Sequence, residues 1–446
     1  MILEIIISIL LLIISLYLFN KLIRTQNGLL LGLLCIYHFI QFIIIIIFTI
    51  FWPEERIGNN IYFKENISSA VIIYGALLLI IISIYIITVY LFNNFNKNKT
   101  YIPLFLSNNA LYNIENRDLT KLSIPILLLY SLEAISIFIP EKTYILNIIL
   151  KLIDFIPLFL GIFYINYSKR LKIYIILLLV VIFLLSIIGG NRGKGSTPIF
   201  LFVCGYIYSN YRSKKTKYLL MLYSIMLIPF LNLFSFVQDF RSIYGRDIEI
   251  NSENIELFFN AKIESTTQNS AIQNSLQRIL GEGNLAVITM TPKYVDYRGT
   301  KALIPELISI FSLTQGNAEI EEKRENRAEI GYGNGILTKY GFRINKFTST
   351  GLGYVGDSYS RFGILGVIGY TAFIGYLILG LQKIIYNRYN KRKIIYWLLI
   401  SYLIFNSIFT VNGSGYIALL RSMFINGLLL IFLINLIYMV TNKRKL

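Results

Sequence analysis

Long apolar runs recur along almost the whole chain, separated by short polar segments. The first run covers residues 2–19, and several others are of similar length and carry few charges. A helix needs roughly 20 apolar residues to cross the hydrocarbon core of a membrane. Only helices and closed barrels satisfy their backbone groups in lipid, and these runs lack the alternation of a barrel strand. The pattern therefore predicts an all-α integral membrane protein.

We predict about eleven transmembrane helices and one large polar loop. The predicted spans cover residues 2–19, 28–51, 70–92, 122–139, 144–165, 171–188, 197–211, 218–237, 362–386, 394–411 and 417–440. Between the eighth and ninth spans the chain carries many charges of both signs. This divides the chain into helices 1–8 in residues 1–237, a loop or cap in residues 238–361, and helices 9–11 in residues 362–446.

The connecting segments alternate between many and few basic residues. The basic set includes Lys21 and Arg24 after the first span, and Lys169, Arg170 and Lys172 before the sixth. Cytoplasmic loops carry the excess of lysine and arginine in membrane proteins. This places the N-terminus outside, the C-terminus in the cytoplasm and the large loop on the extracytoplasmic face.

The composition narrows the classes of function. Of 446 residues, 55% are hydrophobic, and the net charge is +18. We ascribe this charge to the topology bias and to an anionic substrate, not to nucleic acid. Cys35 and Cys204 lie in apolar runs, which argues against disulfides and thiolate metal sites. The single histidine, His38, also lies in an apolar run and is expected to be a packed, hydrogen-bonded core residue. No metal or other cofactor is predicted.

Three charged residues lie well inside the fourth and fifth predicted spans. Glu133 in the fourth span and Lys151 in the fifth are placed at similar depth by the short turn between them, and Asp154 follows Lys151 by one helical turn. Intramembrane charges are costly, so each marks a candidate site. We expect the three to pair. A further cation, Arg421, lies near the outer end of the last span. It either faces a polar cavity or an anionic ligand, or extends to the membrane interface.

A glycine-rich segment with two cations follows the sixth span on the outer face. Residues 189–198 read Gly-Gly-Asn-Arg-Gly-Lys-Gly-Ser-Thr-Pro and include Arg192 and Lys194. Glycine lets the backbone approach a ligand, and the start of a helix favours an anion. The segment is a candidate diphosphate site, and a flexible turn with two solvated bases is the alternative.

Three further segments on the outer face combine acids, arginines and glycines. Asp239 and Arg241 follow the eighth span, and Arg298 lies in the large loop within Tyr-Arg-Gly-Thr. Asp357 and Arg361 precede Phe-Gly-Ile-Leu-Gly at residues 362–366, which opens the ninth span. For each segment an ordinary solvated loop remains the alternative.

These motifs, in this order around one large outer loop, resemble the Wzy-type O-antigen polysaccharide polymerases. The resemblance rests on the glycine-rich stretch with an acid and a tyrosine before Phe-Gly-x-x-Gly, on Tyr-Arg-Gly-Thr with Ile-Pro after it, and on Gly-Asn-Arg-Gly-Lys-Gly. The family commonly has Glu where this chain has Asp357, and Ser where it has Asn191. The resemblance implies the GT-C-like architecture of these polymerases and of the O-antigen ligases.

The resemblance implies a metal-independent glycosyltransferase of the bacterial inner membrane. Such an enzyme moves a growing glycan from one undecaprenyl diphosphate carrier onto a new carrier-linked repeat unit, for O-antigen or capsule. A chain-length regulator and a flippase would be its partners. The catalytic candidates are Asp239, Asp357, Arg192 and Arg241. The candidates for binding diphosphate are Lys194, Arg298, Arg361 and Arg421.

Other functions remain open at this point. A flippase for lipid-linked oligosaccharides shares the size and the substrate, but is expected to have short loops. An O-antigen ligase is expected to use a histidine in the outer loop, and this chain has none there. A protein that only binds or senses glycan at the cell surface is the third alternative.

Overall fold

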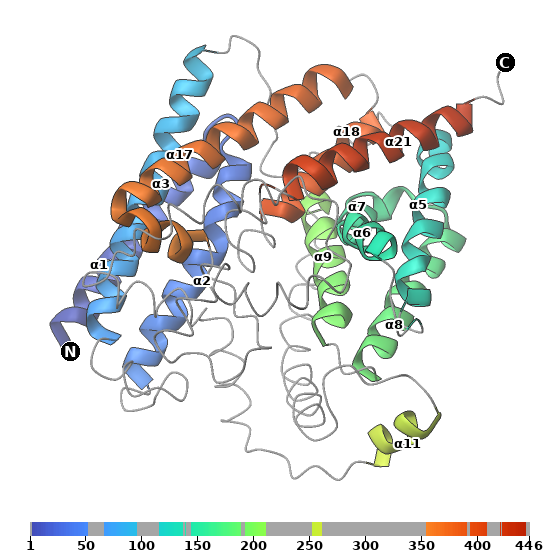
Figure 1. Cartoon of the computed structure of the whole chain (residues 1–446), viewed down its shortest axis with the longest axis horizontal. Helices are drawn as coiled ribbons and strands as arrows, with labels where there is room; N and C mark the ends of the chain where they lie inside the picture. The colour runs from blue at the N-terminus through green and yellow to red at the C-terminus, as the bar shows by residue number, and fades with distance from the viewer. Residues whose placement is uncertain are drawn as a thin grey trace, which may run out of the picture. The chain divides into compact units, whose positions relative to one another are not determined.

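The computed structural model describes residues 2–51, 67–95, 116–136, 139, 144–188, 192–210, 252–260, 354–389, 393–407, 420 and 422–442 (Figure 1). Within these residues all regular secondary structure is helical. Five helices are long and apolar enough to cross a membrane: α1 (Ile2–Arg24), α2 (Leu29–Phe51), α3 (Ile67–Phe95), α8 (Lys169–Ile188) and α17 (Tyr354–Tyr389). The prediction of an all-α membrane protein is confirmed at this level.

The remaining described helices are shorter or more polar. They are α5 (Asn116–Ser136), α6 (Tyr144–Ile153), α7 (Ile156–Phe163), the 3₁₀ turn η2 (Tyr164–Asn166), α9 (Arg192–Asn210), α11 (Ser252–Asn260), α18 (Lys393–Phe405), the π turn η5 (Ser422–Asn426) and α21 (Gly427–Asn442). Helices lie at the positions of all the predicted spans except the eighth, which falls outside the described residues. Of the predicted large loop, the structure describes only α11 and the start of α17.

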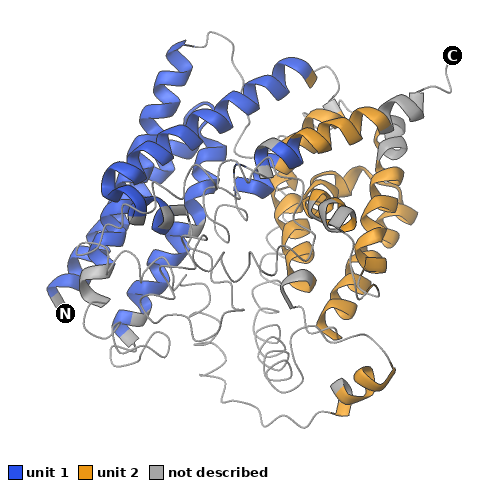
Figure 2. Ribbon diagram, in the orientation of Figure 1, with its two compact units in different colours: residues 1–102, 276–388, 403–427 blue, residues 103–275, 389–402, 428–446 orange. Residues whose placement is uncertain are grey.

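The chain forms two compact units (Figure 2). Unit 1 comprises Met1–Ile102, Leu276–Arg388 and Leu403–Gly427, and unit 2 comprises Pro103–Ser275, Tyr389–Tyr402 and Leu428–Leu446. Each unit therefore combines segments that are far apart in the sequence. The helices α1, α2, α3 and α17 belong to unit 1, whereas α5 to α9 belong to unit 2.

In unit 1, α1, α2 and α3 pack on one another, and a set of side-chain amides joins their ends. Asn27, between α1 and α2, adopts a φ of 69°, a conformation that Asn tolerates better than most residues. Its Nδ2 donates to Asn93 Oδ1 on α3 at 2.8 Å, and Gln382 Nε2 on α17 donates to Asn27 Oδ1 at 3.1 Å. These bonds place the C-terminal ends of α1, α3 and α17 together.

The same end of unit 1 is basic. Lys21 and Arg24 lie in the last turn of α1, and Arg388 lies in the last turn of α17. The grouping of these cations at one end agrees with the alternation found in the sequence. Which face of the membrane this end occupies remains a prediction.

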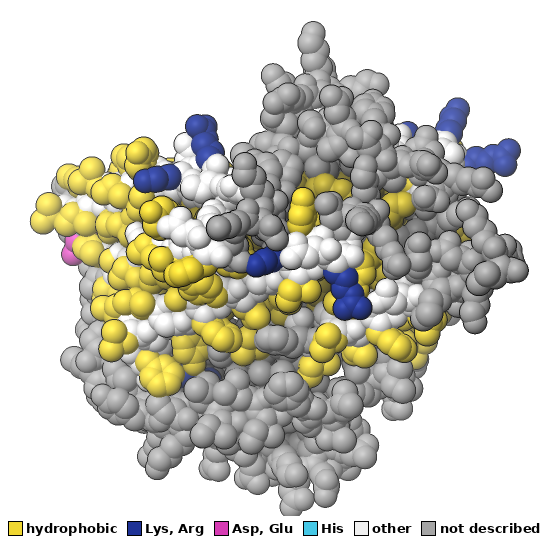
Figure 3. Space-filling model, turned by 90° about the horizontal axis from the view of Figure 1, so that it is seen from above, with side chains coloured by type: hydrophobic (Ala, Val, Ile, Leu, Met, Phe, Trp, Pro, Cys, Tyr) yellow, Lys and Arg dark blue, Asp and Glu magenta, His cyan; other side chains and the backbone are white. Residues whose placement is uncertain are grey.

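Apolar side chains cover much of the outward surface of the long helices. Only 11% of the apolar window of α1 and 28% of that of α8 is buried. Figure 3 shows hydrophobic side chains spread over much of the described surface on one face of the molecule. The exposed large hydrophobic residues of α1 are Leu3, Ile6, Ile9, Leu10, Ile13, Ile14, Leu16 and Tyr17. Such an unbroken apolar face suits contact with lipid.

In unit 2, glycines allow α7 and α9 to touch through their backbones. A Cβ at Gly161 would lie 2.1 Å from the Phe202 carbonyl oxygen, and one at Gly205 would lie 2.2 Å from that of Leu158. Small residues at such crossings let helices approach closely, which is how helices associate where lipid competes for apolar side chains. Gly195 plays a similar part between α9 and α8, because its Cβ would lie 3.2 Å from the Phe183 carbonyl oxygen.

The predicted fifth span is interrupted. α6 ends at Ile153 and α7 begins at Ile156, with Asp154 and Phe155 in a turn between them. Pro157 in the first turn of α7 has no N–H to donate to the Ile153 carbonyl four residues earlier. The prediction of one continuous helix over residues 144–165 is therefore wrong, and the proline is the physical cause.

α17 is bent at the Phe-Gly-Ile-Leu-Gly motif. Gly363 adopts φ 62° and ψ −147°, a combination that is essentially restricted to glycine. After the bend, a Cβ at Gly366 would lie 2.3 Å from the Ser358 carbonyl oxygen, so the spanning part of the helix lies against the short part before it. In this motif Gly363 allows the backbone angle at the bend, and Gly366 allows the two parts of α17 to pack closely.

We expect Gly205→Ala to destabilise the protein. A helical Gly→Ala change usually adds up to about 1 kcal/mol of helix stability. Here the new methyl group would push α9 away from α7, which we expect to reverse the sign and cost about 1–3 kcal/mol. Thermal unfolding of the purified protein measures the effect. The control is Gly369→Ala, since nothing lies within 4 Å of that Cβ position. Equal melting temperatures for the two variants would contradict the packing argument.

Gly363→Ala tests backbone strain alone. Nothing lies within 4 Å of the Cβ position at Gly363, so no clash is expected, but the positive φ disfavours alanine. We expect a loss of about 1–3 kcal/mol in the free energy of unfolding, again compared with Gly369→Ala. A melting temperature at or above that of the wild type would show that the bend is not required.

Candidate functional site

From Arg192 onward, the glycine-rich segment of unit 2 is helical where the sequence predicts a loop. α9 begins at Arg192, so Gly193, Lys194 and Gly195 lie in its first turns, whereas the sequence places the start of the span at Thr197. The close contact of Gly195 with α8 accounts for this earlier start. Arg192 and Lys194 therefore lie at the N-terminal end of an apolar helix, where the first backbone N–H groups have no partner within the helix and favour an anion.

α9 is held against its neighbours at two places along its length. α9 packs on α8 near Gly195 and on α7 near Gly205, and in both places the contact reaches the backbone. The Tyr164 ring adds edge-to-face contacts with Phe202 and Tyr206, at centroid distances of 5.1 and 6.0 Å. A helix held at both ends of its length presents its first turn in one orientation.

The second pair of candidates lies in the short helical part of α17 before the bend. Arg361 is buried, with 2% of its surface exposed, and Asp357 precedes it by one helical turn. A buried arginine requires partners for its five N–H donors, and Arg361 interacts with neighbouring groups. This pair belongs to unit 1, whereas Arg192 and Lys194 belong to unit 2.

The other predicted site residues lie outside the part of the chain that the structure describes. These are Asp239, Arg241, Arg298 and Arg421. Their roles remain predictions.

His38 belongs to a buried polar cluster between α2 and α3. Its Nδ1 lies 3.0 Å from the Tyr74 hydroxyl, and that hydroxyl donates to Gln41 Oε1. Because the Tyr74 proton goes to Gln41, His38 Nδ1 is the donor in the first bond. The three side chains are at most 2% exposed. The prediction that His38 is a packed, hydrogen-bonded residue is confirmed.

Both predicted intramembrane acids belong to unit 2. Glu133 on α5 is buried, with 6% exposed, and Asp154 lies in the turn between α6 and α7. Both interact with neighbouring groups, and Tyr130, one helical turn before Glu133, is also buried. The side chain of Lys151 lies outside the description, so its pairing with either acid stays a prediction.

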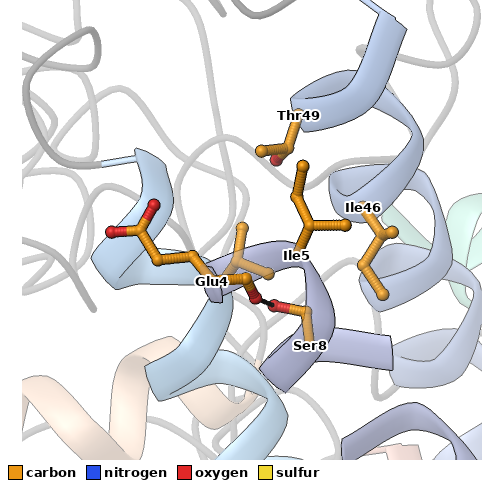
Figure 4. A pocket seen from close by; sticks show the side chains of 6 residues that line it. Glu4, Ile5, Ser8, Ile46 and Thr49 are labelled. Atoms are coloured by element: carbon orange, nitrogen blue, oxygen red, sulfur yellow. Dashed lines mark hydrogen bonds between the residues drawn. The ribbon is translucent and has the colours of Figure 1, made fainter. Parts of the chain in front are cut away.

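A small pocket lies at the end of unit 1 away from the amide set. It encloses about 10 Å³ and is lined by Glu4, Ile5, Ser8, Ile46, Thr49 and Val71 (Figure 4). Figure 4 shows the Glu4 carboxylate pointing away from Ile46 and Thr49. A volume of this size holds a single water at most, so the pocket is not a site for a glycan or a lipid carrier.

The sequence analysis did not identify the cluster of Tyr74 and Gln41 or the amide set. The residues of each group are far apart in the chain, and none stands out within its own apolar run. Gln41 and Asn93 are amides within or at the ends of such runs, and uncharged polar residues inside predicted spans are the signal that could have identified them.

Comparison with known proteins adds no family assignment. No family model, curated protein or solved structure matches this chain.

Proposed function

We propose that this protein polymerises glycan repeat units carried on undecaprenyl diphosphate, at the outer leaflet of a bacterial inner membrane. The observation that carries the proposal is the start of α9. Two cations, Arg192 and Lys194, lie in the first turn of an apolar helix that is held on its neighbours through glycines. A fixed helix start with adjacent cations suits the diphosphate of a lipid anchored beside it.

The proposed reaction is a transfer of glycan between two lipid carriers. The bond between the anomeric carbon of the growing glycan and its diphosphate oxygen breaks, and a glycosidic bond to the acceptor hydroxyl forms. Negative charge develops on the departing diphosphate, where Arg192, Lys194 and further arginines would stabilise it. The proton of the acceptor hydroxyl would pass to a carboxylate, for which Asp239 and Asp357 are the candidates. This chemistry requires no metal or nucleotide.

A flippase for the same lipid-linked units is the second candidate. One observation favours it, namely the interruption between α6 and α7, with Asp154 in the turn and the buried Glu133 on the neighbouring helix α5, because transporters bind coupling ions at discontinuous helices. The large outer loop that the sequence predicts argues against a flippase, which is expected to have short loops.

We predict that purified protein in liposomes converts carrier-linked repeat units into a ladder of longer products without added metal or nucleotide. Arg192→Ala should reduce the rate of elongation by about 10²–10³-fold, as expected for the loss of a group that stabilises developing charge. The control is Lys169→Ala, since Lys169 is exposed in the first turn of α8, at the opposite end of that helix from Arg192. Product length on gels is the measurement.

Two results would count against the polymerase. Single units that remain unextended, with intact substrate and folded protein, would move the flippase to first place, and transport of single units would then be measured in the same liposomes. A ladder unaffected by Arg192→Ala would support polymerisation but show that the start of α9 is not part of the active site.

The orientation can be tested separately by cysteine labelling. In a variant without Cys35 and Cys204, we expect Arg170→Cys to be protected from a membrane-impermeant maleimide in spheroplasts and to react after permeabilisation. Ile139→Cys, just after the C-terminal end of α5, should react with the maleimide from outside the cell. Both positions are exposed. The reverse pattern would place Arg192 on the cytoplasmic side, away from the proposed substrates.

A further inference from the structure

Buried amides bring the basic residues of α1 and α17 to one end of unit 1. Asn27 follows Arg24 by three residues, between α1 and α2. Gln382 Nε2 on α17 donates to Asn27 Oδ1 at 3.1 Å, and Lys383 is the next residue of that helix. The Asn27 and Gln382 side chains are buried. The C-terminal end of α1 is therefore held beside the last turns of α17.

Four cations lie at this end of unit 1. We call this surface the basic end, and it comprises Lys21, Arg24, Lys383 and Arg388. Lys383 is half-buried, and the other three side chains are exposed. The acids in the described part of unit 1 are Glu4 and Asp357, which lie near the starts of α1 and α17 and not near their ends. Within its described residues, unit 1 therefore supplies no carboxylate to the basic end.

The helix ends themselves balance only part of this positive charge. The helices α1, α3 and α17 end here, joined through the amides of Asn27, Asn93 and Gln382. Each C-terminal end carries roughly half a negative charge, whereas α2 begins here with a similar positive charge. Against four cations, this leaves an excess of roughly three positive charges. The basic end therefore attracts an anion.

On α1 an exposed apolar face leads into the basic end. Ile13 is 58% and Tyr17 69% exposed, and Lys21 and Arg24 follow Tyr17 by four and seven residues. Residues at this spacing lie on one face of a helix. This face is therefore apolar along the span, aromatic near its end and basic at the end itself. Tyrosine is enriched at the level of lipid headgroups, and the cations lie just beyond it.

The exposed face of α17 has the same order. Phe373 is 48% and Tyr376 41% exposed, and Lys383 lies on the same face, two turns after Tyr376. Gly380 lies one turn before Lys383, and nothing lies within 4 Å of its Cβ position, so there is open space beside the cation. Figure 3 looks onto the described surface from the side where α3 and α17 end, and it shows Lys and Arg side chains beside hydrophobic ones.

We propose that the basic end of unit 1 binds the headgroups of anionic phospholipids, for which phosphatidylglycerol is the probe. The phosphates contact the four cations, and the acyl chains lie along the exposed apolar faces of α1 and α17. A soluble anion would use the charge alone, whereas a phospholipid uses both the charge and the apolar faces that lead to it. Basic residues next to membrane helices attract anionic lipids in this way. The proposal does not depend on glycan transfer.

The test is the melting temperature of the purified full-length protein in nanodiscs of phosphatidylcholine, with and without added phosphatidylglycerol, at constant salt and pH. A ligand that binds the folded state raises the melting temperature. We expect phosphatidylglycerol to raise it by about 2 °C or more. The double variants Lys21→Gln/Arg24→Gln and Lys383→Gln/Arg388→Gln each remove two of the four cations, so each should reduce the shift by about half. The matched control is Lys21→Arg/Arg24→Lys, which retains the charge at the same positions and should keep the shift.

The proposal is overturned if the wild type melts at the same temperature in both lipids, or if both glutamine variants keep the full shift. Dissolved glycerol phosphate, added to nanodiscs of phosphatidylcholine alone, should leave the melting temperature unchanged, and a shift equal to that of the lipid would overturn the proposal in favour of a soluble anion. Each variant is compared with itself in the two lipids, so a general loss of stability does not affect the result. Should one glutamine variant fail to fold, the other decides the question. No glycan is present, so the outcome is independent of the polymerisation assay.

Discussion

The absence of water within the hydrocarbon core governs how these helices associate. Lipid chains are as apolar as leucine, so an apolar side chain gains little by leaving lipid for another helix. A polar group gains much more, because its only partners there are in the protein. In unit 1 the amides of Asn27, Asn93 and Gln382 join the ends of three helices, and Tyr74 joins α3 to α2. In unit 2 two serine–tyrosine pairs set the register of α5 against α8.

Glycine supplies the second means of association. Where α7 crosses α9, the backbone of each helix occupies the space that a side chain would need on the other, at Gly161 and Gly205. The same residue type serves a different purpose at Gly363, where space is available but the backbone angle excludes other residues. The sequence alone does not distinguish a glycine needed for close helix packing from one needed for a positive φ. Their different responses to alanine follow from the geometry at each position.

Hydropathy predicted the helices well because span length and apolar content depend on local sequence alone. It failed at the α6–α7 interruption, where Pro157 lies within an apolar run that looks continuous, and at the start of α9, where packing on α8 makes a glycine-rich stretch helical. Of the site, the sequence located the candidate motifs and the intramembrane acids. It could not find the cluster around Tyr74, because this cluster arises from partners on another helix. The proposed function still rests on the resemblance and on the chemistry of α9.

The two kinds of charge in unit 2 require different explanations. Cations at a helix start, such as Arg192 and Lys194, can reach the membrane surface at little cost, and an anionic lipid substrate gives them a use. Glu133 is different, because it is buried on α5 two residues after Ser131, which lies 3.2 Å from the Tyr174 hydroxyl on α8. A buried carboxylate needs partners within the protein, and Glu133 interacts with neighbouring groups there. Contacts between helices therefore account for the acid, whereas the proposed lipid substrate accounts for the cations at the start of α9.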